Sequence, residues 1–161
     1  MFEKVLGLPV HVLVVHAVVV FVPLLVLLAV AYIALPRFRS RLDWAVAALA
    51  VIAPITAWVG TESGEALQER QIARGFAGEI LAQIEEHASY GDVLSLITLG
   101  LALAVILLLV ANSGHRRVPT VPRWVPPLLS VAVVVLGVLA LVYVWFTGHS
   151  GAEIVWGNTF E

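Results

Sequence analysis

The stretch LPVHVLVVHAVVVFVPLLVLLAVAYIAL, residues 8–35, decides the fold. Its apolar run from Pro9 to Leu35 contains no Asp, Glu, Lys or Arg. As a helix rising about 1.5 Å per residue, this run is long enough to cross about 30 Å of hydrocarbon. Two imidazoles, His11 and His16, stand among its aliphatic side chains. Because an ionisable group is costly inside a membrane segment, the two histidines indicate a function.

The composition is that of an integral membrane protein. The chain has 161 residues, of which 61% are hydrophobic and 12% charged, and its mean hydropathy is +1.01. Soluble domains are about half apolar and a quarter charged. We therefore expect one membrane domain over residues 1–161. The chain has no cysteine, which excludes disulfides, thiolate zinc sites, cysteine-bound iron–sulfur clusters and covalently attached haem.

Four apolar segments predict an all-α, four-transmembrane-helix bundle. The spans are expected at about residues 9–35, 44–60, 93–111 and 125–147. Between the second and third spans, we expect a short helical connector outside the membrane. Its second half, GEILAQIEEHASY, has a helical period with one apolar face. That half either continues into the third span as one long helix or lies on the membrane surface.

Arginine placement predicts the orientation of the bundle. One short connector contains Arg37, Arg39 and Arg41, and the other short connector contains Arg116, Arg117 and Arg123. Short cytoplasmic loops are enriched in Lys and Arg. We therefore expect both termini outside (N-out, C-out) in a bacterial plasma membrane, with the connector between spans two and three on the extracytoplasmic side.

Four of the five histidines converge on that outer side. The group comprises His11, His16, His87 and His149. The orientation was derived from arginines alone, so this convergence is an independent signal. Five residues correspond to about 500° of helical rotation, which turns His11 and His16 about 140° apart. The deeper His16 is favoured as the inward side chain. The fifth, His115, is expected to be a solvated loop residue.

Imidazoles from different helices at one depth suit two chemistries. The first is b-type haem held by two axial histidines, with His16 and His87 as the favoured pair and His11 and His149 as alternates. In that reading Arg70 and Arg74 hold a haem propionate or an acidic partner, although ion pairs with nearby glutamates explain them equally well.

The second chemistry is a zinc or copper site formed by the same four histidines. Glu62 or Glu65 would complete it. A third reading is a structural subunit of a larger membrane complex, with the histidines as hydrogen-bonding groups. The sequence shows no nucleophile–base pair, phosphate loop or catalytic carboxylate motif, so an enzyme acting alone ranks below these readings.

Two motifs resemble a bacterial family of small four-helix membrane proteins of unknown function. The opening LPVHVLVVHAVVVFVP is similar to the family's Leu-Pro-x-His-Pro, Val-His and Phe-Pro pattern, with Val12 in place of a proline. The tail TGHSGAEIVWG is similar to its Gly-rich ending, with Ala152 where a second glycine is common, and His87 also fits. Members found beside Rieske-type or cytochrome c domains imply membrane redox chemistry.

The expected partners follow from this reading and from the charge pattern. The lipid bilayer is the first. Most acidic residues fall on the outer side, which would steer a basic, cytochrome c-like carrier; the resemblance adds a Rieske-type redox partner. A homo-oligomer or a larger complex stays open, and no nucleic-acid partner is expected.

Overall fold

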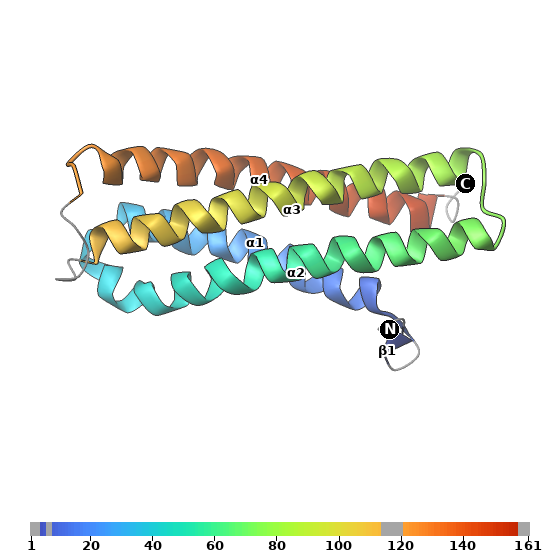
Figure 1. Ribbon diagram of the computed structural model, residues 1–161, viewed down its shortest axis with the longest axis horizontal. Helices are drawn as coiled ribbons and strands as arrows, with labels where there is room; N and C mark the ends of the chain where they lie inside the picture. The colour runs from blue at the N-terminus through green and yellow to red at the C-terminus, as the bar shows by residue number, and fades with distance from the viewer. Residues whose placement is uncertain (1–3, 6–7, 114–120, 158–161) are drawn as a thin grey trace.

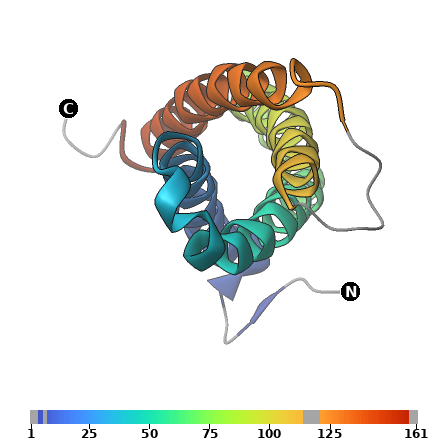
Figure 2. The same cartoon turned by 90° about the vertical axis from the view of Figure 1, so that its left-hand side faces the viewer.

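The computed structural model describes residues 4, 5, 8–113 and 121–157. Within them, four long helices run alternately up and down and close into a ring (Figures 1 and 2). They are α1 (Val10–Ala34), α2 (Arg39–Ala73), α3 (Glu79–Asn112) and α4 (Val125–Trp156). A 3-10 turn, η1 (Pro36–Phe38), joins α1 to α2. Two two-residue strands, β1 (Lys4–Val5) and β2 (Leu8–Pro9), pair before α1.

The four-helix membrane prediction is confirmed, because each of these helices is long and apolar enough to span a bilayer. Their lengths differ from the predicted spans. α2 has 35 residues and α3 has 34, so each is about 50 Å long at 1.5 Å per residue. α4 continues beyond its expected end at Thr147 as far as Trp156. The helices therefore exceed the hydrocarbon thickness at the end that carries the chain termini (Figure 1).

The predicted outer connector is helical, but it consists mostly of continuations of α2 and α3. Its second half is continuous with the third span, as the first of the two alternatives required. Only residues 74–78 lie between the two helices. Gly75 and Gly78 have φ angles of 90° and 68° there, a backbone conformation that glycine adopts at little cost. This tight turn lets the polar halves of α2 and α3 remain side by side (Figure 1).

The core follows one face of α1 and a small-residue face of α2. Buried residues of α1 recur at steps of three and four: Val18, Val22, Leu25, Ala29 and Tyr32. The facing buried residues of α2 include Ala50, Ala53, Ala57 and Gly60. Small side chains let helix backbones approach closely in membranes. This close packing fixes the rotation of α1, and with it the direction of each α1 side chain.

A polar contact ties three helices at the end opposite the chain termini. The Arg39 guanidinium donates from Nε to the Tyr32 carbonyl at 3.1 Å and from Nη1 to Asn112 Oδ1 at 2.9 Å. It also lies over the Tyr32 ring, 5.1 Å from the centroid. The contact joins α1, α2 and α3 where the short connectors lie.

Candidate functional site

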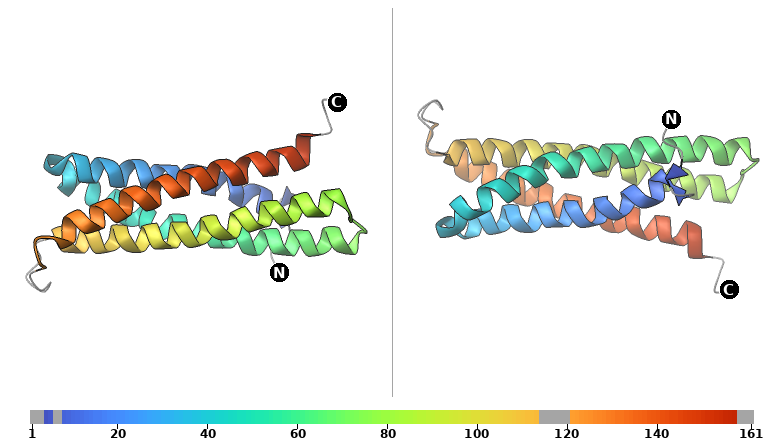
Figure 3. Two further views of the ribbon diagram at one scale, coloured as in Figure 1. Left: turned by 90° about the horizontal axis from the view of Figure 1, so that it is seen from above. Right: turned by 90° about the horizontal axis from the view of Figure 1, so that it is seen from below.

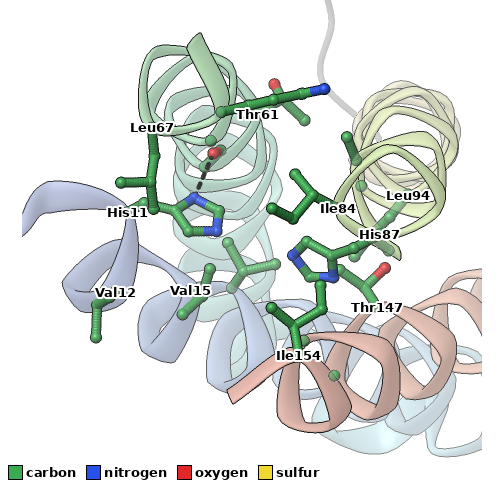
Figure 4. Close-up of a pocket in the computed structure, with 18 of the residues that line it drawn as sticks. His11, Val12, Val15, Thr61, Leu67, Ile84, His87, Leu94, Thr147 and Ile154 are labelled. Carbon is green, nitrogen blue, oxygen red and sulfur yellow. Dashed lines mark hydrogen bonds between the residues drawn. The ribbon is translucent and has the colours of Figure 1, made fainter. Parts of the chain in front are cut away.

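Two histidines from opposite helices meet inside the half of the bundle that carries the chain termini. His11 lies in the first turn of α1, and His87 lies in the third turn of α3. Each of these helices packs against α2 and α4, so the two side chains reach across the ring. Their ring centroids are 6.1 Å apart with planes at 88°, and Figure 4 shows the two rings directed toward one another.

Helix α2 fixes the orientation and tautomer of His11. Its Nδ1 lies 3.0 Å from the Gly60 carbonyl oxygen. A carbonyl oxygen only accepts, so Nδ1 carries the proton and donates it, and Nε2 keeps its lone pair. The ring rests on Gly64, where an added Cβ would lie 3.1 Å from His11 Cε1. A larger residue at this position would require the imidazole to move by a few tenths of an ångström.

Helix α4 holds His87 in the same manner. Its Nδ1 lies 3.0 Å from Ser150 Oγ, and that hydroxyl donates to the Thr147 carbonyl at 3.3 Å. The Ser150 oxygen is thereby left to accept from Nδ1–H, and Nε2 of His87 also keeps its lone pair. A Cβ on Gly151 would lie 2.9 Å from His87 Cε1. Both imidazoles are thus fixed on one nitrogen and available on the other.

The pair lies in a cavity of about 550 Å³ that all four helices line. Its wall is mainly aliphatic and glycine-rich, and Val15, Ile84 and Ile154 surround the two rings in Figure 4. Two buried lining atoms, Thr147 Oγ1 and Gln71 Oε1, have no hydrogen-bond partner among the described residues. Buried polar atoms are normally paired, so these two indicate room for a ligand with polar groups.

His16 does not face inward, which corrects our expectation. Its side chain is exposed on the outside of the bundle, and its Nδ1 donates to the Val12 carbonyl at 2.6 Å. The expected 140° separation from His11 holds, but the packing face of α1 decides which of the two points inward. Counting back from Val18 in steps of three and four reaches Val15 and His11 and passes over His16.

His149 is also directed away from the pair. Its ring stacks on Trp145, with centroids 5.2 Å apart and planes at 6°, and its Nε2 lies 3.4 Å from Glu153. The next residue, Ser150, is the one that contacts His87. The four histidines therefore do not gather at one point, and the structure brings together only His11 and His87. His115, Arg116 and Arg117 lie outside the described residues.

The charged candidates lie around the cavity rather than at the two rings. Arg70 is half-buried and lines a second hollow of about 370 Å³ behind His11, together with Glu62. Arg74 is exposed at the end of α2, and Glu65 lies on the rim of the main cavity. Among residues 4, 5, 8–113 and 121–157, no three His, Cys, Asp or Glu side chains are grouped to hold a metal ion.

Of the residues that position the pair, sequence reasoning missed Ser150, and it gave little weight to Gly60, Gly64 and Gly151 because they also read as ordinary loop residues. One signal for them was available. Gly60 and Gly64 continue the small-residue face of α2 at spacings of three and four, which marks a close helix contact. Ser150 and Gly151 carry no comparable signal, because a Gly-rich segment after an apolar run also reads as a loop.

The fold and the site together define a class: a small four-helix membrane protein with a paired-imidazole cavity near one end of the bundle. The chain belongs to the DUF2231 family, described as a predicted membrane protein, whose model matches residues 7–160. This confirms the resemblance to a four-helix family of unknown function. No curated protein and no solved structure matches the chain.

Proposed function

We propose that the protein is a membrane electron-transfer subunit that binds b-type haem between His11 and His87. The observation that carries this proposal is the prepared pair: two imidazoles from opposite helices, each donating from Nδ1 and each with a free Nε2. A metal-binding histidine usually donates its other ring N–H to a carbonyl or hydroxyl group, which fixes the tautomer and the ring direction.

The spacing of the rings supports coordination of a single ion. Bonds from metal ions to imidazole nitrogen are about 2.0–2.1 Å long, so imidazoles on opposite sides of one ion have ring centres about 6 Å apart. The centroids of His11 and His87 are 6.1 Å apart. Little movement of α1 or α3 is therefore needed for both Nε2 atoms to ligate one iron.

The donor set favours haem over a bare zinc or copper ion. A zinc site uses three or four protein ligands, whereas a porphyrin supplies four nitrogens itself and needs two axial ligands from the protein. The described residues supply two neighbouring imidazoles and no group of three candidate ligands. The mainly apolar cavity walls suit a porphyrin, and the unpaired Gln71 and Thr147 oxygens suit its polar substituents.

The proposed function specifies the side of the membrane on which the haem lies and the electron-transfer partner that reaches it. By the positive-inside rule, Arg37, Arg41 and Arg123 mark the cytoplasmic end, so the haem would lie near the extracytoplasmic surface of a bacterial plasma membrane. The exposed carboxylates of the outer helical extensions, among them Glu69, Glu79 and Glu85, would steer a basic carrier of the cytochrome c type. A Rieske-type partner is the alternative that the family resemblance offers.

Ligand substitutions test the proposal. His11→Ala and His87→Ala should each abolish the low-spin haem spectrum of protein purified in detergent, measured oxidised and after dithionite reduction. His16→Ala and His149→Ala should retain it, because His16 is exposed at the rim of the cavity and His149 is directed away from the pair. Retention of an unchanged low-spin spectrum in both His11→Ala and His87→Ala would refute the assignment. A colourless wild type with bound zinc or copper would favour the bare-metal function.

A further inference from the structure

The main cavity has a border of residues that are themselves exposed on the outside of the bundle. On α1 these residues are Val12, His16 and Val19, and on α4 they are Gly148, Ala152 and Val155. Both sets have spacings of four and three, so each follows one edge of its helix. The cavity therefore reaches the outer surface between α1 and α4.

The neighbouring helices diverge at this position. α1 and α4 contact closely deeper in the bundle, where a Cβ on Gly137 would lie 3.0 Å from Val26. Toward the chain termini the two helices move apart, as Figures 1 and 3 show. On the opposite side of the cavity, α2 and α3 remain close, with Thr61 at 3.8 Å from a Cβ on Gly91. The opening is therefore lateral, on the side of the bundle that a bilayer would surround.

His16 stands on the rim of this opening with one free nitrogen. The Val12 carbonyl accepts from Nδ1, so Nε2 carries a lone pair and has no partner among the described residues. His16 lies about 7.5 Å along the helix axis from His11. A polar group facing hydrocarbon without a partner is costly. A lipid-soluble ligand with a hydroxyl head would satisfy it, because the hydroxyl can donate to Nε2.

We propose that the opening between α1 and α4 binds the head of an isoprenoid quinol, with His16 Nε2 accepting a hydrogen bond from one quinol hydroxyl. The proposal rests on the haem function proposed above. A quinol is the occupant that fits, because it partitions into the bilayer, offers a hydroxyl donor at its head and carries electrons that a neighbouring haem can accept. A phospholipid acyl chain would fill the apolar opening but leave Nε2 without a donor.

The redox step balances as a two-electron oxidation in two single transfers. Oxidation breaks both quinol O–H bonds, releases two protons and leaves two carbonyl groups. A haem held by His11 and His87 would accept the two electrons one at a time and would pass each to the downstream carrier. Both protons leave to water at the membrane surface, and the proton of the hydroxyl bonded to His16 leaves by way of Nε2.

Matched tryptophan substitutions on α1 test the opening. Val19 lines the cavity at 44% exposure, and Val20 faces away from it at 55%. In phosphatidylcholine vesicles containing decylubiquinol, the haem of the wild type and of Val20→Trp should be reduced at the same rate. Val19→Trp and His16→Phe should each slow this reduction at least tenfold, while dithionite should give all four proteins the same reduced spectrum.

The outcomes separate this proposal from the haem assignment. Two results would overturn the quinol site and leave the haem assignment standing. In the first, dithionite reduces the haem but decylubiquinol does not. In the second, Val19→Trp and His16→Phe are both reduced at the wild-type rate. If the protein binds no haem, an azidoquinone probe decides. Crosslinks within residues 12–19 support the quinol site if unlabelled quinone competes them away. The site is overturned if no crosslinks form there or if only acyl-chain lipid competes them away.

Discussion

A single carbonyl decides what His11 can do. Because Gly60 offers only an acceptor, the proton stays on Nδ1, and Nε2 faces His87 as a potential ligand. Ser150 imposes the same state on His87 through its own donation to Thr147. Both supports come from the neighbouring helix rather than from the histidine's own helix, so the pair is positioned by tertiary packing.

The glycine beneath His87 gives the first prediction. Gly151→Ala places a Cβ 2.9 Å from His87 Cε1, so the ring must shift away from its ligating position. Haem affinity should fall at least tenfold, which is about 1.4 kcal/mol. Titration of cofactor-free protein with hemin measures it. The control is Gly157→Ala, six residues later in the chain and outside the cavity lining, where a Cβ meets nothing within 4 Å. Equal affinities in the two variants would contradict the supporting role of Gly151.

Sequence reasoning favoured His16 as the inward side chain of α1, but the structure leaves His16 exposed and turns His11 inward. It placed His11 and His16 on different faces from helix geometry alone. The cost of burying a polar ring deep in the membrane then favoured His16. That cost does not determine direction, because α1 is apolar on every face and its hydropathy has no orienting period. Packing against the small residues of α2 determines the direction of each α1 side chain. This packing joins residues far apart in the sequence, so the sequence of α1 alone does not reveal it.

At the scale of elements, the length of the helices places the histidine pair beyond the buried apolar core, toward the chain termini. The polar half of α2 and the polar half of α3 continue beyond their apolar halves, and His87 lies on that extension of α3. The sequence predicted the four apolar segments because length and hydropathy decide them locally. It left the continuity of α2 open, because a polar segment with helical propensity continues a helix only when a neighbouring helix supports it.

The contact of Arg39 with α1 and α3 gives an element-scale prediction. Arg39→Ala removes two charge-assisted hydrogen bonds to Tyr32 and Asn112, so the free energy of unfolding should fall by about 1.5–3 kcal/mol. Denaturant unfolding in detergent micelles measures it. Because the contact lies at the far end of the bundle from the cavity, the haem spectrum of the folded variant should not change.

Arg41→Ala is the matched control for Arg39→Ala. Arg41 lies in the first turn of α2 and is exposed, so its loss should change the free energy of unfolding by less than about 0.5 kcal/mol. Equal destabilisation by the two substitutions would show that charge at this end, rather than the three-helix contact, stabilises the bundle.

At the scale of the whole molecule, the bundle has chemically different ends. Arginines surround the two short connectors, and carboxylates cover the extensions around the α2–α3 turn. We propose from the positive-inside rule that the histidine pair lies on the extracytoplasmic side. An electron carrier outside the cytoplasm could reach a haem bound at this pair only in that orientation. The proposed function therefore depends on the orientation of the bundle.

Single cysteines test the orientation, and the cysteine-free chain makes them specific. Ala77→Cys lies in the α2–α3 turn and Ser40→Cys at the start of α2, and both positions are exposed. In intact bacterial spheroplasts, a membrane-impermeant maleimide should label Ala77→Cys and should label Ser40→Cys only after permeabilisation. The reverse pattern would place the histidine pair in the cytoplasm and contradict an extracytoplasmic electron partner.

The most direct test of haem ligation by His11 and His87 is the absorption spectrum of the purified wild type after hemin loading. The spectrum is recorded for the oxidised protein and again after reduction with dithionite. Binding through His11 and His87 predicts one haem per chain, a low-spin oxidised spectrum, and sharp α and β bands on reduction. A protein that folds as a four-helix bundle yet takes up no stoichiometric haem, or binds it without a low-spin spectrum, would contradict the claim that the two histidines are axial ligands.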